Sequence, residues 1–262
     1  MKQVLTIAGS DSGGGAGIQA DLKAMSANGV FGMSVITSIT AQNTKCVTSV
    51  FDLPVSIIEA QLDAIFDDFE VAAVKTGMLS SSAIVDTVSR KLAQHQVANL
   101  IVDPVMVAKS GQALLQPDAV EKVKTALIPQ ALLVTPNIQE AERLSGMTIK
   151  TLADARQAAK AIHKLGCRHV LVKGGHLLAE KGTDLLYDGR FFNVYKGEYI
   201  DTPHTHGTGC TYASAIAAQL GKGKTLPDAV SAAKTYITEA IRHGLAIGHG
   251  KGPTNHFYFL TP

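Results

Sequence analysis

The chain has 262 residues, of which 46% are hydrophobic and 18% are charged, and its formal net charge is +2. This composition indicates a compact globular protein, and the small net charge argues against nucleic acid or an anionic membrane as a partner. No apolar run approaches the roughly 20 residues of a membrane span. Three widely spaced cysteines, Cys46, Cys167 and Cys210, form neither a disulfide framework nor a zinc pattern. We therefore expect a reduced, cytoplasmic protein.

Strand-like and helix-like patterns alternate along the chain. The predicted strands are Val4–Ala8, Ser34–Thr40, Val71–Val74, Leu100–Val102, Leu132–Thr135 and His169–Lys173. The predicted helices are Ile18–Asn28, Ser56–Asp68, Ser80–His95, Pro117–Leu127, Leu152–Leu165, Cys210–Leu220 and Pro227–His243. A hairpin signal, Asp188-Gly189, separates the strands Asp184–Tyr187 and Arg190–Tyr195. The order predicts one α/β domain over residues 1–262, with a doubly wound, mostly parallel central sheet, helices on both faces and a small antiparallel edge.

The first predicted strand runs into a glycine-rich loop, residues 11–17, before the first helix. Open parallel sheets bind ligands beyond the carboxyl ends of their strands, so this loop is a candidate ligand edge, although glycines alone also fit a plain flexible loop. The strand Ser34–Thr40 delivers Gln42 to an edge as well. The Gln42 carboxamide offers an acceptor and a donor, which suits a neutral heterocycle, and a glutamine facing water is the alternative.

Carboxylates and amides follow two later strands. Asp103 comes directly after Leu100–Val102, where it is either a turn cap or a group that organises Mg²⁺-bound water near phosphates. Asn137 and Glu140 lie three residues apart at a helix start, so they face one direction, and this spacing fits an N-cap pair.

Several basic side chains either contact a phosphate or nucleotide, or simply face solvent. They are Lys109, Lys173 and His176.

The stretch His206-Gly207-Thr208-Gly209-Cys210 precedes a helix of small residues. Glycine turns expose backbone N–H groups and a helix start adds unpaired N–H groups and a positive dipole end, so this is a ready anion site. At that end the pKa of the Cys210 thiol is expected to fall. An anion cradle beside a base suits phosphoryl transfer. The alternative is a tight turn into a core helix, with Cys210 as a small buried hydrophobe.

Taken together, these motifs resemble the hydroxymethylpyrimidine and phosphomethylpyrimidine kinases of thiamine biosynthesis, in the ribokinase-like superfamily. The resemblance extends from Leu5 to His256. It rests on the segments 8–17, 42–44, 75–79, 103–106, 137–140, 173–176 and 205–210. Vitamin B6 kinases share similar motifs, so a pyridoxal or pyridoxine kinase is the alternative. Gln42 favours the pyrimidine, whose ring nitrogen and amino group match one carboxamide. A catalytically silent binding protein of the same fold is disfavoured by the intact Cys210, Asn137 and Glu140.

The resemblance implies an ATP- and Mg²⁺-dependent kinase that phosphorylates 4-amino-5-hydroxymethyl-2-methylpyrimidine and then its monophosphate, giving the diphosphate. It implies that Cys210 is the base and that Gly207, Thr208 and Gly209 form the anion hole. The implied substrate-binding residues are Gly9, Ala16, Asp21, Gln42, Met78 and Val105. The implied ATP- and phosphate-binding residues are Asn137, Glu140, Lys173 and Lys234, and Asp103 and Glu140 are implied for Mg²⁺ through water. It also implies a homodimer.

Overall fold

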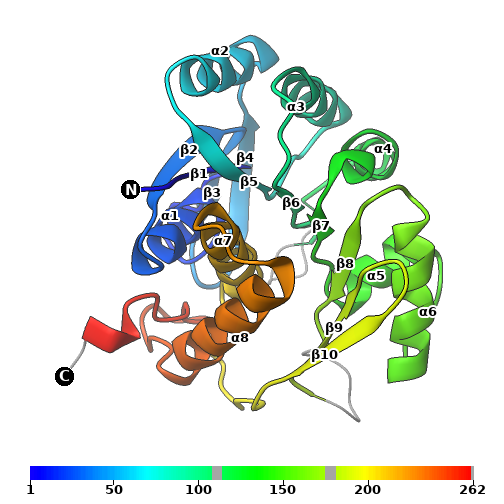
Figure 1. The fold of residues 1–262 in the computed structure, drawn as a ribbon. Coiled ribbons are helices and arrows are strands. Elements are labelled where there is room, and N and C mark those ends of the chain that lie inside the picture. The colour runs from blue at the N-terminus through cyan, green and yellow to red at the C-terminus, as the bar shows by residue number, and fades with distance from the viewer. Residues whose placement is uncertain (108–113, 175–180, 261–262) are drawn as a thin grey trace.

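The computed structural model describes residues 1–107, 114–174 and 181–260. Its central sheet has eight strands in the order β10-β9-β8-β7-β6-β5-β1-β2 (Figure 1). Their bounds are β1 Gln3–Ala8, β2 Phe31–Ile36, β5 Val71–Thr76, β6 Leu100–Val102, β7 Leu133–Val134, β8 His169–Val172, β9 Thr183–Tyr187 and β10 Phe192–Lys196. Within this sheet, β2, β1, β5, β6, β7 and β8 pair in parallel, whereas β9 pairs antiparallel with both β8 and β10. The predicted sheet and its antiparallel edge are therefore confirmed.

Helices cover both faces of the sheet (Figure 1). One face carries α1 Gly17–Ala27, α7 Thr208–Gly221 and α8 Leu226–Arg242. The other carries α2 Val55–Phe66, α3 Ser82–Gln94, α4 Pro117–Lys122, α5 Ile138–Ser145 and α6 Leu152–His163. Over the described ranges, no helix has the length and apolar character needed to cross a bilayer.

Side chains of the central strands alternate between two cores because successive residues of a strand point to opposite faces. Leu5 and Ile7 of β1 join the core under α2 to α6, whereas Val4 joins the core under α1, α7 and α8. In β6 the same alternation puts Leu100 in the first core and Ile101 in the second. Burial on both faces explains why these strands are continuously apolar in sequence.

The prediction of one strand over 34–40 is wrong, because the chain leaves the main sheet at Thr37. β2 ends at Ile36, whose backbone N–H donates to the Gln61 side chain and whose carbonyl accepts from it. The next segment, β3 Ser38–Gln42, pairs antiparallel with β4 Val47–Asp52, a strand that the sequence did not reveal. The resulting two-stranded sheet carries Gln42 beyond the carboxyl end of β1.

The helix predicted over 117–127 is also interrupted. α4 ends at Lys122, a π-helical turn covers Val123–Leu127, and a 3-10 turn with Pro129 follows. Since proline has no N–H to donate, the α-helical hydrogen-bond pattern does not continue through it.

A buried ion pair ties the sheet to the helices at the carboxyl end of the strands. The Lys75 ammonium of β5 donates to both carboxylate oxygens of Asp21 in α1, at 2.9 and 3.0 Å. Asp21 also accepts from the hydroxyls of Thr6 in β1, at 2.6 Å, and Ser214 in α7, at 2.7 Å. Burial disfavours the charged form of Lys75, but Asp21, Cys210 and Asp103 together outweigh it and raise the pKa of Lys75 above its ordinary value.

We predict that Lys75→Met lowers the free energy of unfolding by about 3–5 kcal/mol, because Asp21 is left buried without its counter-charge. Urea denaturation measures the change. The matched control is Lys124→Met, which breaks the exposed Lys124–Glu121 pair and is expected to cost less than about 1 kcal/mol. Equal effects of the two substitutions would show that the buried pair does not hold this edge together.

Candidate active site

The anion cradle lies at the start of α7, beside the carboxyl ends of the central strands. α7 begins at Thr208, two residues earlier than predicted, with Gly207 as its N-cap at φ 77°. A side chain at Gly207 would overlap the carbonyl oxygen of Gly15, so this turn requires glycine on grounds of both space and backbone angle. Amides in the first turn of a helix have no acceptor within it, so the turn can bind an anion.

Asp103 and Lys173 face this cradle from the ends of β6 and β8. The Lys173 ammonium donates to Oδ1 of Asp103 at 2.8 Å, and Thr135 donates to the same oxygen at 2.9 Å. A Cβ added to Gly209 would lie 3.4 Å from Lys173 Nζ and 3.8 Å from Asp103 Oδ2, so the ion pair lies against the helix start. Burial raises the pKa of Asp103, but Lys173 and Lys75 outweigh it and hold that pKa below its ordinary value.

Asp103 keeps one oxygen unused. Oδ2 is buried and has no hydrogen-bond partner among the described residues. A buried carboxylate oxygen without a partner is costly. Its position beside Gly209 leaves it available to a ligand of the cradle.

Asn137 and Glu140 form the predicted N-cap pair of α5. The Asn137 backbone N–H donates to Glu140 Oε2 at 2.8 Å, and the Glu140 N–H donates to Asn137 Oδ1 at 2.9 Å. Burial raises the pKa of Glu140 to about 7; Lys173 opposes the rise and Asp103 adds to it. The N-cap interpretation of Asn137 and Glu140 is therefore confirmed. The charges of Lys173 and Asp103, which face the cradle, also act on the pKa of Glu140.

Cys210 follows the cradle and is half-buried. The expectation of an acidic thiol is wrong: burial raises the pKa of Cys210 to about 11. Lys75 opposes this rise, but the carboxylates of Asp21 and Asp103 reinforce it. Burial and the two nearby carboxylates destabilise the thiolate more than the positive end of the helix stabilises it.

The predicted acceptor pocket comes together from β1, β5 and β3. A side chain at Gly9 would overlap the Met78 side chain, so these two residues touch. Gly13 of the glycine loop packs on Asn43 and the backbone of Gln42; a Cβ there would lie 3.3 and 3.4 Å away. The structure therefore places the glycine loop, Met78 and Gln42 around the same edge.

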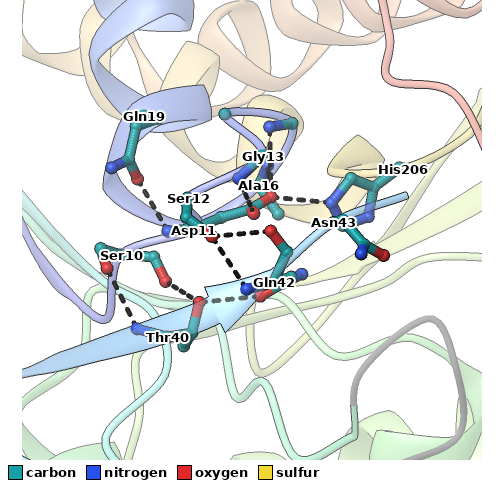
Figure 2. A network of polar contacts seen from close by, with 12 residues as sticks. Ser10, Asp11, Ser12, Gly13, Ala16, Gln19, Thr40, Gln42, Asn43 and His206 are labelled. Carbon is teal, nitrogen blue, oxygen red and sulfur yellow. Dashed lines mark hydrogen bonds and ion pairs between the residues drawn. The ribbon is translucent and has the colours of Figure 1, made fainter. Parts of the chain in front are cut away.

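Gln42 is clamped through its backbone, as Figure 2 shows. The Ser12 hydroxyl donates to the Gln42 carbonyl at 2.7 Å and accepts from the Gln42 N–H at 2.8 Å. The Gln42 side-chain oxygen accepts from Thr40 Oγ1 at 3.3 Å, while that hydroxyl also donates to the Ser10 carbonyl at 2.8 Å. Gln42 thus has a fixed backbone and a loosely held carboxamide.

Asp11 organises the glycine loop and was not predicted to do so. One of its oxygens accepts from the N–H of Gly13 at 2.8 Å, and the other accepts from the N–H groups of Gly15 and Ala16. His206 Nε2 lies 2.8 Å from that second oxygen. Burial works against the charged carboxylate, but the bonds from His206 and Ala16 lower the pKa of Asp11 below its ordinary value. The sequence signal was an aspartate two residues before a glycine, which is typical of a turn.

Two predicted ligand residues are engaged elsewhere. Asp21 is fully buried in the ion pair with Lys75, rather than lining the acceptor pocket. Lys234 donates to Asp184 at 2.7 Å and lies over the Tyr212 ring. Val105 is half-buried two residues beyond Asp103. The predicted contacts of Lys109 and His176 lie outside the described residues.

The fold and the cradle define an α/β phosphotransferase of the ribokinase-like class. The family model described as phosphomethylpyrimidine kinase matches residues 11–255. The hydroxymethylpyrimidine/phosphomethylpyrimidine kinase of Bacillus subtilis is 49% identical over 98% of this chain and 95% of its own length. The enzyme of that name from Haemophilus influenzae is 50% identical over 99% of this chain and 98% of its own. The structure of an ADP complex of Bacillus subtilis pyridoxal kinase has a TM-score of 0.92 at 43% identity, covering 99% of this chain and 98% of that one.

The chain belongs to the phosphomethylpyrimidine kinase family. The predicted fold, and the prediction of a phosphotransferase acting on the pyrimidine of thiamine biosynthesis, are confirmed by these relatives.

We predict that alkylation of Cys210 by iodoacetamide accelerates about tenfold per pH unit between pH 7 and pH 10, because only the thiolate reacts and the pKa of Cys210 lies near 11. The rate is measured by mass spectrometry of the Cys210 peptide. The exposed Cys46 is the internal control, since its alkylation reports that active reagent is present at each pH. A Cys210 rate that levels off below pH 8 would contradict the raised pKa.

Proposed function

We propose that this chain transfers the γ-phosphoryl group of ATP first to the hydroxymethyl oxygen of 4-amino-5-hydroxymethyl-2-methylpyrimidine and then to the resulting monophosphate. The observation that carries the proposal is the glycine cradle of α7, which lies against Asp103 and Lys173 on one side and against the glycine loop on the other. A cradle between a nucleotide side and an acceptor pocket suits transfer of a phosphoryl group in line between two oxygens.

The acceptor ring is proposed to lie between Met78 and Gln42. The Gln42 carboxamide accepts from the pyrimidine amino group and donates to the adjacent ring nitrogen. Its orientation is adaptable, because Thr40 holds it with a single bond of 3.3 Å. Gly9, Ala16 and Val105 complete the proposed wall without adding charge, which suits a neutral ring.

In the first step the hydroxymethyl oxygen forms a bond to the γ-phosphorus as the bond from that phosphorus to the β-phosphate oxygen breaks. The hydroxyl proton passes to the Cys210 sulfur. A thiolate with a pKa near 11 is rare at neutral pH but is a stronger base than an ordinary thiolate. A loose transition state requires little early deprotonation, so this rare form is sufficient. The amides of residues 207–209 stabilise the charge on the transferred group.

In the second step the acceptor is a phosphate oxygen that is already largely ionised near neutral pH. No proton has to leave for the bond to form. The same cradle therefore serves both steps, while Cys210 matters for the first alone.

The residues present fit a Mg²⁺ ion beside the phosphates. Asp103 Oδ2 is buried without a partner among the described residues, and oxygen is the ligand that Mg²⁺ prefers. Burial raises the pKa of Glu140 to about 7, so a nearby cation would stabilise its charged form. Mg²⁺ usually keeps several waters and takes one or two carboxylates, which agrees with a water-mediated site. When bound, the ion neutralises phosphate charge; Lys173 and the cradle amides orient the phosphates.

Two expectations remain: a homodimer, which the family resemblance implies, and a cytoplasmic location, which the cysteine pattern indicates. Both stay predictions. The runner-up activity is phosphorylation of vitamin B6 compounds, because a pyridoxal kinase shares this fold at 43% identity.

Steady-state kinetics with the pyrimidine alcohol, its monophosphate and pyridoxal test the proposal. We expect kcat/KM for the pyrimidine alcohol to exceed that for pyridoxal by at least about tenfold, because an unpaired carboxamide group at Gln42 penalises the wrong ring. The matched variant Gln42→Met should narrow that ratio. A preference for pyridoxal in the wild-type enzyme would reject the pyrimidine assignment.

We predict that Cys210→Ala lowers kcat for phosphorylation of the alcohol by about 10²–10⁴-fold, because general-base assistance is lost. The same substitution should change phosphorylation of the monophosphate by less than about threefold, since an ionised phosphate oxygen needs no base. Coupled ADP-release assays with each acceptor measure both rates. The exposed Cys46→Ala is the control. Equal losses in both steps would assign Cys210 to structure or phosphate binding instead.

A further inference from the structure

The acceptor-side loop and the phosphoryl cradle are in direct backbone contact, although they come from opposite ends of the chain. A Cβ on Gly207 would overlap the Gly15 carbonyl oxygen, and a Cβ on Gly15 would overlap the His206 ring. No side chain separates the two turns at this point. Any shift of the loop therefore changes the distance between the acceptor pocket and the cradle.

Among the residues that the structure describes, one polar contact joins side chains across this junction. His206, the residue before the cradle, places Nε2 2.8 Å from Oδ2 of Asp11 (Figure 2). The same oxygen accepts from the N–H of Gly15 at 3.1 Å and of Ala16 at 2.8 Å, while Oδ1 accepts from Gly13 at 2.8 Å. A carboxylate can accept all of these bonds, whereas an asparagine amide would turn a donor toward one set of them.

His206 is itself anchored by the C-terminal segment. Its backbone N–H donates to the Gly252 carbonyl at 3.0 Å, and its carbonyl accepts from the Thr254 N–H at 3.3 Å. The ring is buried, with 10% of the side chain exposed. Asp11 is anchored too, because its N–H donates to the Gln19 side chain of α1 at 2.8 Å. The contact between His206 and Asp11 therefore joins two residues whose backbones are each held by other hydrogen bonds.

We infer that Asp11 and His206 are positioning residues that hold the acceptor pocket in register with the phosphoryl cradle. The inference rests on the proposed function of that cradle. On the acceptor side, Ser12 follows Asp11 in the chain and forms hydrogen bonds with both backbone groups of Gln42. On the phosphate side, His206 is followed directly by Gly207 of the cradle.

Loss of the contact should act on the rate of transfer more than on binding. The acceptor pocket and the cradle each keep their own residues when the link is cut, so both ligands still bind. Their separation is no longer fixed, and a misplacement of about 1 Å can cost about 10²-fold in rate. The expected signature is therefore a fall in kcat for both acceptors with little change in KM.

The experiment compares His206→Leu with His206→Gln in the full-length enzyme. Leucine removes the donor, whereas glutamine offers an N–H toward Asp11. We expect His206→Leu to lower kcat by about 10–100-fold for the alcohol and for the monophosphate, with each acceptor KM within about threefold of wild type. His206→Gln should recover most of that loss. Rates are normalised to the folded fraction from thermal denaturation.

Asp11→Asn provides the second variant if His206→Leu folds poorly, and it should show the same division between kcat and KM. The control is Asp188→Asn. Asp188 also accepts backbone N–H bonds in a turn, from Arg190 and Phe191, but this turn joins β9 and β10 at the edge of the sheet. Its kcat should stay at the wild-type value. The inference is overturned if His206→Leu keeps wild-type kcat, if glutamine and leucine lose rate equally, or if KM rises in place of the fall in kcat. Failure of the proposed function is a separate result, seen as a wild-type enzyme that does not phosphorylate the pyrimidine.

Discussion

The site depends on burying charges of opposite sign at the carboxyl edge of the sheet. Lys75 is paired with Asp21, and Lys173 is paired with Asp103, all four with little or no exposure. Isolated charges could not be kept there, because the cost of removing one ion from water is several kcal/mol. In pairs, each ion has a counter-charge. Burial raises the pKa of both Glu140 and Cys210; Lys173 opposes the rise at Glu140, Lys75 opposes it at Cys210, and Asp103 adds to both.

That environment changes what a cysteine can contribute. A helix start alone would make Cys210 a good thiolate and a weak base. Burial beside Asp21 and Asp103 makes it a poor thiolate and a stronger base. The second combination suits an alcohol, whose own proton is held tightly, and it has no bearing on an acceptor that is already ionised. One site can therefore serve two acceptors of different acidity without exchanging residues.

The parts of the structure that depend on local pattern were predictable from the sequence. The apolar strands of the parallel sheet, the Asp188-Gly189 hairpin and the N-cap pair of Asn137 with Glu140 all formed as expected. The family motifs also placed Gly9, Met78 and Gln42 near one another. The strand, hairpin and N-cap signals lie within a few residues of the features that they predict, whereas the proximity of Gly9, Met78 and Gln42 came from the family resemblance and not from local pattern.

The features that were missed depend on contacts between distant segments. The strand break at Thr37 follows from bonds to Ala8 and Met78, and the edge at Ile36 is closed by Gln61. The role of Asp11 depends on His206, and the raised pKa of Cys210 depends on the whole buried surroundings of the thiol. The residue pattern within any one of these segments does not indicate which distant segment it will contact.

The same reasoning separates the two lysines that were assigned to nucleotide from sequence. Lys173 lies against the cradle itself, and Oδ2 of its partner Asp103 has no hydrogen-bond partner in the described part of the chain. Lys234 instead neutralises Asp184, whose other oxygen accepts from the Gly174 N–H at 3.0 Å. The geometry therefore gives Lys234 an indirect part: it holds the Asp184 carboxylate, which accepts from the backbone N–H of Gly174 next to Lys173.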